Sequence, residues 1–135
     1  MLHYHGTSLA AAQALAGNPP QVSVSVGGGE LGQGFYTGDH VALAAAWARG
    51  RHPAWVVLEI SVSVADYISL ALLVLNWSQV VNTWNQLRVS GMTHTFQFGY
   101  DVIYGPLATF PHAGQHKFES LAAEVVLRRS VWRVI

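Results

Sequence analysis

Short groups of glycine and proline divide this chain into brief segments. Residues 17–20 (Gly-Asn-Pro-Pro), 27–29 (three glycines) and 105–106 (Gly-Pro) each separate one run of apolar residues from the next. Proline lacks the N–H that a helix interior or a central strand needs, and glycine loses the most conformational entropy when it is held in either. The chain therefore has to fold from many short helices and strands joined by turns.

The composition predicts one domain, residues 1–135, without covalent or metal staples. Of the 135 residues, 51% are hydrophobic, which is enough to build a single core. The chain has no cysteine, so neither disulfides nor thiolate metal sites can form. The seven histidines show no metal-ligand spacing together with carboxylates, and we predict no metal site.

The charge pattern argues against a large nucleic-acid surface or a membrane segment. Seven basic residues balance seven acidic ones, so the basic footprint of a strong nucleic-acid binder is missing. The most apolar run, residues 68–75, is far shorter than the roughly 20 residues that cross a bilayer. The N-terminus does not resemble a secretory signal. These features predict a cytoplasmic chain that does not engage a membrane.

Residue periodicity predicts an α+β fold. Alternation and β-branched residues indicate strands at 2–5, 22–26, 55–62, 95–104, from 115, and at 131–135. Helical spacing and capping residues indicate helices after Ser8 to 16, after Asp39 to about 49, over 66–87 with a break near Asn76, and at 121–127. The many tryptophans of so apolar a chain, Trp77 and Trp84 among them, are expected in the core.

Two motifs together suggest a pocket for a nicotinamide ring. The first is residues 4–7 (Tyr-His-Gly-Thr), and the second is residues 32–37 (Gly-Gln-Gly-Phe-Tyr-Thr), followed by Trp47. A flat pyridinium needs aromatic faces for stacking, a close backbone for its carboxamide and a polar side chain for the attached ribose. Tyr36 and Trp47, the Gly6 backbone and His5 can supply these three requirements.

These residues resemble the ADP-ribosyltransferases of the diphtheria-toxin and poly(ADP-ribose) polymerase type, whose His-Tyr-Glu set grips NAD. In the polymerase branch a second aromatic follows the motif tyrosine by eleven positions, and that position is Trp47 here. Residues 28–36 and 115–120 resemble small transferase domains at the ends of bacterial polymorphic toxins. The resemblance covers most of the chain.

The resemblance implies an ADP-ribosyltransferase-like split β-sandwich, in which two small sheets with flanking helices surround an NAD cleft. It implies that His5 holds the adenosine-side ribose, that Gly6, supported by Thr7, binds the carboxamide, and that Tyr36 and Trp47 enclose the nicotinamide. The NAD-binding residues it implies are His5, Gly6, Thr7, Gly34, Phe35, Tyr36 and Trp47. The catalytic residues it implies are His5, Tyr36, Gln115 and Glu119.

The third motif departs from the family pattern. Gln115 stands where the family has a glutamate that holds the ribose 2′-hydroxyl and stabilises the ribosyl cation. A neutral amide keeps the hydrogen bond but adds no negative charge. Glu119 is the candidate helper, because side chains four residues apart on a strand share a face. Either Gln115 or Glu119 can therefore be the third catalytic residue. Ala44 replaces the polymerase-type serine that contacts the carboxamide.

The expected function is that of an NAD-dependent mono-ADP-ribosyltransferase, a bacterial toxin or effector that uses NAD as co-substrate and releases nicotinamide. Its acceptor would be a protein or a nucleic acid, selected by loops 27–31 and 109–114. It would act in the cytoplasm of the producing or the target cell and have a cognate immunity or antitoxin protein. The alternatives are an NAD glycohydrolase and a catalytically inactive module that binds NAD or ADP-ribose.

Overall fold

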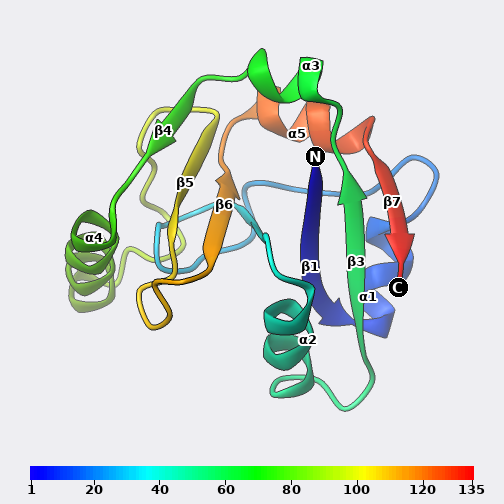
Figure 1. The fold of residues 1–135 in the computed structure, drawn as a ribbon, viewed down its shortest axis with the longest axis horizontal. Helices are drawn as coiled ribbons and strands as arrows, with labels where there is room; N and C mark the ends of the chain where they lie inside the picture. Colours follow the sequence, from blue (N-terminus) through cyan, green and yellow to red (C-terminus); the bar gives the residue numbers. More distant parts are fainter.

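The computed structural model describes residues 1–135 as a mixed α+β fold, as predicted (Figure 1). The strands are β1 (Leu2–Ser8), β2 (Phe35–Gly38), β3 (Trp55–Ser61), β4 (Leu72–Val74), β5 (Val102–Pro106), β6 (Gly114–Phe118) and β7 (Val131–Val134). The helices are α1 (Leu9–Leu15), α2 (Val41–Arg49), α3 (Val64–Ile68), α4 (Trp77–Ser90) and α5 (Leu121–Arg128).

All seven strands belong to one sheet in the order β4-β5-β6-β2-β1-β3-β7, instead of the two separate sheets that the sequence suggested. The sheet is nevertheless almost divided in the middle. Strands β1 and β3 pair along their whole lengths, from Leu2↔Ser61 to Ser8↔Trp55, whereas β1 and β2 share only the pair Tyr4↔Gly38. In Figure 1 the group β4, β5 and β6 accordingly stands apart from the group β1, β3 and β7.

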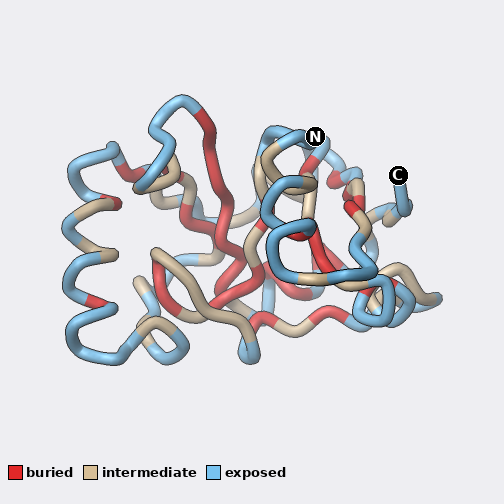
Figure 2. Tube along the Cα trace, turned by 90° about the horizontal axis from the view of Figure 1, so that it is seen from below, coloured by how far each residue is buried: buried red, intermediate tan, exposed pale blue.

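The structure has two apolar clusters, and the larger one takes residues from both halves of the sheet. The larger cluster lies between the sheet and α5 and includes Phe35, Ile60, Phe118 and Leu127. The smaller one lies under α4 and consists of Leu31, Leu75, Val80 and Ile103. Buried positions gather in the middle of the molecule, while α4 at one end is mostly exposed (Figure 2). The two halves therefore hold together through the central strands and through the larger cluster, which includes residues of both β3 and β5.

Local signals fix the ends of several helices as the sequence predicts. The Ser8 hydroxyl accepts a hydrogen bond from the Ala11 N–H and caps α1. Asn76 breaks the predicted helix over 66–87 and begins α4 with a capping box that includes Gln79. Helix α4 ends at Gly91, whose φ of 70° suits glycine. None of the helices is both long and apolar enough to cross a membrane.

Two predicted features of the N-terminal half are wrong: the strand over residues 22–26 and the helix cap at Asp39. Residues 22–26 form no strand, because the Val24 N–H donates to the Glu124 side chain instead of a neighbouring strand, at 3.1 Å. Asp39 does not cap α2; its carboxylate accepts from the Gly114 N–H at 3.1 Å, and His40 takes the N-cap position without a side-chain hydrogen bond.

The segment 66–104 also differs from its prediction. A short strand, β4, interrupts the expected helical region and pairs parallel with β5. The expected strand over 95–104 begins only at Val102, because backbone N–H groups of residues 98–100 bond to the Glu119 carboxylate and not to a strand. Trp77 is 49% exposed and donates its indole N–H to the Ala108 carbonyl, so it is not a core residue.

A buried histidine pair links the two halves of the sheet. His3 on β1 and His116 on β6 have ring centroids 4.6 Å apart, and both side chains are buried. His3 Nδ1 lies 3.0 Å from the Thr37 hydroxyl, and His116 Nε2 lies 3.0 Å from the Tyr67 hydroxyl. Burial lowers the pKa of His3 to about 3 and that of His116 to about 4. Both rings are therefore neutral in the folded protein above these values.

We predict that stability falls as the pH falls below about 6.5, the value at which histidine charges in the unfolded chain. Below this pH the unfolded chain binds protons at His3 and His116, and the folded protein does not. This proton binding lowers the free energy of unfolding by up to about 2 kcal/mol for each of the two histidines between pH 7.5 and pH 5. Urea titrations at the two pH values measure this difference.

The matched comparison is between His116→Gln and His112→Gln. His116 is buried, whereas His112 is exposed. The first substitution should reduce the pH dependence and the second should leave it unchanged. An equal pH dependence in the wild type and His116→Gln would contradict the assignment.

Candidate functional site

The strand pairing shows which way the peptide groups of β1 point. The Met1 ammonium donates to the Val62 carbonyl at 2.7 Å, and the Val62 N–H donates to the Met1 carbonyl at 2.9 Å. In an antiparallel pair, alternate residues direct both backbone groups to the same neighbour. Odd-numbered residues of β1 therefore face β3, and Tyr4 and Gly6 face β2.

The Gly6 peptide groups have no strand partner on that side. The β1–β2 register ends at Tyr4↔Gly38, and the next hydrogen-bonded pair would be Gly6 with Tyr36. The Tyr36 carbonyl is instead bound by His5 Nδ1, at 2.7 Å. Glycine is required here, because a Cβ on residue 6 would lie 2.1 Å from the Ala44 carbonyl oxygen on α2. The junction thus presents an N–H and a C=O on an unpaired strand edge.

His5 lies at this junction as a neutral hydrogen-bond acceptor. A carbonyl only accepts, so His5 Nδ1 carries the proton and Nε2 keeps its lone pair. Nε2 makes no hydrogen bond within the protein, and the ring stacks on Phe35 with centroids 4.4 Å apart. Burial lowers the pKa of His5, which keeps the ring uncharged. Thr7, two residues along β1, is buried and points to the same side.

Tyr36 is held beside the junction by the glycine-rich loop that precedes it. Its hydroxyl donates to the Gly32 carbonyl at 2.6 Å and accepts from the Leu31 N–H at 3.0 Å. The backbone of Gly29 lies over the ring, since a Cβ there would be 3.0 Å from Tyr36 Cζ. Burial chiefly, with the nearby carboxylates of Glu30 and Glu119, raises the pKa of Tyr36. The tyrosine is a neutral phenol covered by its own loop.

The structure does not assemble the predicted Tyr36–Trp47 sandwich. Trp47 on α2 is 49% exposed, and the Arg51 guanidinium lies over its ring at 4.1 Å from the centroid. Two other predicted NAD-binding residues are occupied in packing. Phe35 belongs to the larger apolar cluster, and Gly34 lies against the aliphatic stem of Lys117.

Gln115 on β6 is buried, with 4% of its surface exposed, and bonds to a residue that the sequence analysis did not single out. Its Nε2 donates to Glu30 Oε1 at 2.8 Å and to the Pro106 carbonyl at 3.2 Å. Glu30 Oε1 also accepts from the Ala108 N–H at 2.9 Å. Glu30 stands within the motif run 28–36, but local sequence marks it only as a loop residue, and its contact with Gln115 spans 85 positions.

Glu119 is occupied by structural contacts. Its carboxylate accepts from the N–H groups of Phe98 and Gly99 at 2.9 and 2.8 Å and forms a buried ion pair with Lys117. Burial lowers the pKa of Lys117, and the hydrogen bond and charge of Glu119 oppose that shift. Both carboxylate oxygens are already bonded within the protein. The geometry therefore does not support the prediction that Glu119 assists Gln115.

We predict that Glu119→Gln lowers the free energy of unfolding by about 3 kcal/mol, because it leaves the Lys117 ammonium buried without its counter-charge. The double substitution with Lys117→Met should cost at least about 1 kcal/mol less than the sum of the two single ones. Urea unfolding of the full mutant cycle measures both values.

The control is the exposed ion pair between Arg133 and Glu59. Glu59→Gln should cost less than about 1 kcal/mol, as is usual for surface pairs. Equal costs at positions 59 and 119 would contradict a structural role for the buried pair.

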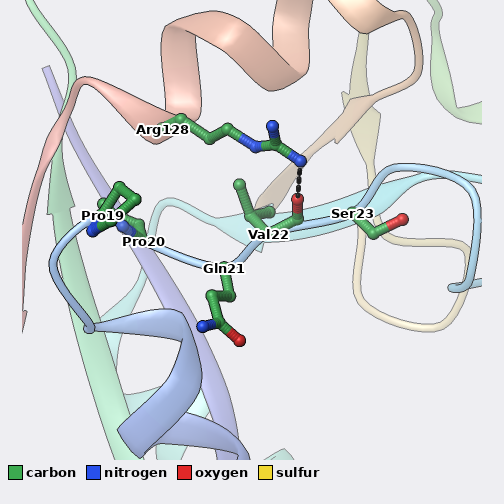
Figure 3. Close-up of a pocket in the computed structure, with 6 residues that line it drawn as sticks. All are labelled: Pro19, Pro20, Gln21, Val22, Ser23 and Arg128. Carbon is green, nitrogen blue, oxygen red and sulfur yellow. Dashed lines mark hydrogen bonds between the residues drawn. The ribbon is translucent and has the colours of Figure 1, made fainter.

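Two surface cavities are formed by other residues than those of the junction. One, of about 400 Å³, is lined by residues 19–23 and by Arg128, whose guanidinium donates to the Val22 carbonyl at 3.3 Å (Figure 3). The other, of about 290 Å³, is lined by Asp39, Tyr104 and residues of the 111–114 segment. Neither includes His5, Gly6, Tyr36 or Gln115 among its lining residues.

No model of a known protein family matches the chain, and no curated protein matches it significantly. The candidate site therefore rests on its own geometry. No group of three or more His, Cys, Asp or Glu side chains is placed to hold a metal ion.

Proposed function

We propose that this chain is an NAD-dependent mono-ADP-ribosyltransferase with a split, ADP-ribosyltransferase-like sheet. The observation that carries the proposal is the junction between β1 and β2. There Gly6, a buried residue, lies beyond the last residue pair of β1 and β2, so its N–H and C=O face a stretch of β2 with which β1 is not paired, next to the His5 ring and the Tyr36 carbonyl. A nicotinamide carboxamide has one acceptor and one donor group, which complements this pair of backbone groups.

The proposed transfer of ADP-ribose from NAD needs few protein groups. The bond between nicotinamide N1 and ribose C1′ breaks, its electron pair leaves with nicotinamide, and C1′ becomes an oxocarbenium-like cation. A nucleophile of the acceptor then bonds to C1′ and loses its proton to solvent. His5 Nε2 is free to accept from a hydroxyl of the adenosine-side ribose, and the Gln115 side chain would hold the ribose that carries C1′. The two residues thus orient the dinucleotide, and the Gly6 backbone holds the leaving group.

For the nicotinamide ring to stack on Tyr36, the Gly29 backbone has to move away from the tyrosine ring. Residues 27–29 are glycines, so their backbone can adopt conformations that are closed to other residues. Movement of this loop would expose the Tyr36 ring to the ligand, while Trp47 is already half exposed. Loops 27–31 and 109–114 would then select a protein or nucleic-acid acceptor, and a cognate immunity protein would cover the same edge if the chain is a bacterial toxin.

Two related functions share this site and differ in their products. A glycohydrolase passes ADP-ribose to water alone, and an inactive module binds NAD or ADP-ribose without releasing nicotinamide. The burial of a neutral Gln115 at the third-motif position is the observation that favours the inactive module. Measuring nicotinamide release together with the fate of ADP-ribose separates the three.

We predict that the purified chain, incubated with NAD and a bacterial lysate, releases nicotinamide and labels a macromolecule with ADP-ribose. Tyr36→Ala should reduce release roughly 100-fold, the order that misplacement of a reacting group costs. Tyr36→Phe, which keeps the ring, should retain most of the activity. Chromatography of nicotinamide and a radiolabel count on precipitated protein and RNA provide the two measurements.

The matched control is Tyr100→Ala, because Tyr100 is an exposed tyrosine outside the site. Thermal melting of each variant separates loss of activity from loss of fold. Full nicotinamide release by a folded Tyr36→Ala variant would contradict the proposed pocket. Release without label would favour the glycohydrolase.

A further inference from the structure

We propose that Glu30, together with Gln115, forms the ribose-binding and cation-stabilising unit of the site, with Glu30 supplying the negative charge that Gln115 lacks. This inference rests on the proposed function and names a further catalytic residue for it. Its basis is a contact that neither motif predicts, the hydrogen bond from Gln115 Nε2 to Glu30 Oε1 at 2.8 Å.

The charge of Glu30 is not neutralised by a neighbouring cation. The other carboxylate beside the site, Glu119, is paired with the buried Lys117, so that pair carries no net charge. Glu30 takes part in no ion pair with a lysine, an arginine or a histidine. Among the carboxylates near Gln115, Glu30 is the one that bonds to the Gln115 side chain itself, and its negative charge remains available to a developing cation.

The hydrogen bonds of Glu30 fix one of its oxygens and leave the other free. Oε1 accepts from both Gln115 Nε2 and the Ala108 N–H, which holds the carboxylate in one orientation. Oε2 makes no hydrogen bond within the protein, and neither does Gln115 Oε1. The pair thus offers two adjacent free acceptors, which suits the neighbouring hydroxyl groups of a ribose.

The sheet places these acceptors one strand away from the junction. Gln115 pairs with Gly38, and Gly38 pairs with Tyr4, two residues before Gly6. Gly38 has no side chain, and the nearest atom to a Cβ at that position would be 3.8 Å away. No side chain on β2 therefore separates Gln115 from the β1 edge at this row.

The pairing with Glu30 also accounts for an amide at position 115. A glutamate there would set two carboxylates at hydrogen-bond distance in a buried position, and one of them would have to be protonated. Gln115 donates to Glu30 and still keeps an acceptor. The two residues divide between them the hydrogen bonding and the charge that the family places on a single glutamate.

The test is Glu30→Gln, which keeps an oxygen to accept from Gln115 and Ala108 and removes only the charge. We expect kcat for nicotinamide release to fall about 100-fold, with KM for NAD changed less than threefold and the melting temperature preserved. The double variant Glu30→Gln with Gln115→Glu restores one negative charge to the pair, and its kcat should be at least tenfold higher than that of Glu30→Gln alone. Glu59→Gln, a glutamate on the far half of the sheet, is the control and should behave as wild type.

The outcomes separate this inference from the proposed function. Wild type that releases nicotinamide while Glu30→Gln loses less than threefold in kcat overturns the role of Glu30 alone. A Glu30→Gln variant that loses activity through melting shows only a structural role for Glu30, and one that loses activity through KM alone shows ribose binding without cation stabilisation. Either result overturns the role of Glu30 in stabilising the cation. Wild type that neither releases nicotinamide nor binds NAD in calorimetry overturns both proposals.

Discussion

The hydrogen bond from His5 Nδ1 to the Tyr36 carbonyl decides where the sheet of this protein stops being continuous. Had Tyr36 accepted from Gly6 instead, β1 and β2 would pair along their lengths and the sheet would have no inner edge. The close approach of Gly6 to α2 acts in the same direction, because it holds β1 against the helix. A side chain and a glycine thus open a backbone edge in the middle of a sheet, where such edges are normally closed.

Much of the fold could be predicted from local sequence, because its determinants are local. Ser8 and Asn76 begin helices through their own side chains, and β3, α5 and β7 follow from apolar runs. The two strands that were predicted wrongly, over 22–26 and at 95–101, share one cause. At Val24 and at Phe98, a distant buried carboxylate satisfies the backbone N–H that a strand neighbour would otherwise take. Periodicity reports which side chains are buried and cannot report which group completes the backbone.

The candidate site likewise has a part that local sequence predicts and a part that it does not. The meeting of His5, Gly6 and Tyr36 follows from two short motifs on strands that must lie near each other, and the structure brings them together. Trp47 is instead half exposed on α2, with the Arg51 guanidinium over its ring. The hydrogen bond between Gln115 and Glu30 joins residues 85 positions apart, so the local sequence around either residue gives no signal for it.

The arrangement around Gln115 also explains how a buried site can hold a net negative charge. Desolvating an isolated carboxylate is costly unless donors compensate for the lost water. Glu30 retains partial exposure and receives two N–H groups on one oxygen, while the second oxygen stays uncommitted. Lys117, the nearest buried cation on the same strand, is bound to Glu119 and so does not quench Glu30. In the proposed function the Lys117–Glu119 pair would serve the site indirectly, because a free ammonium there would oppose the negative charge that we propose to stabilise a ribosyl cation.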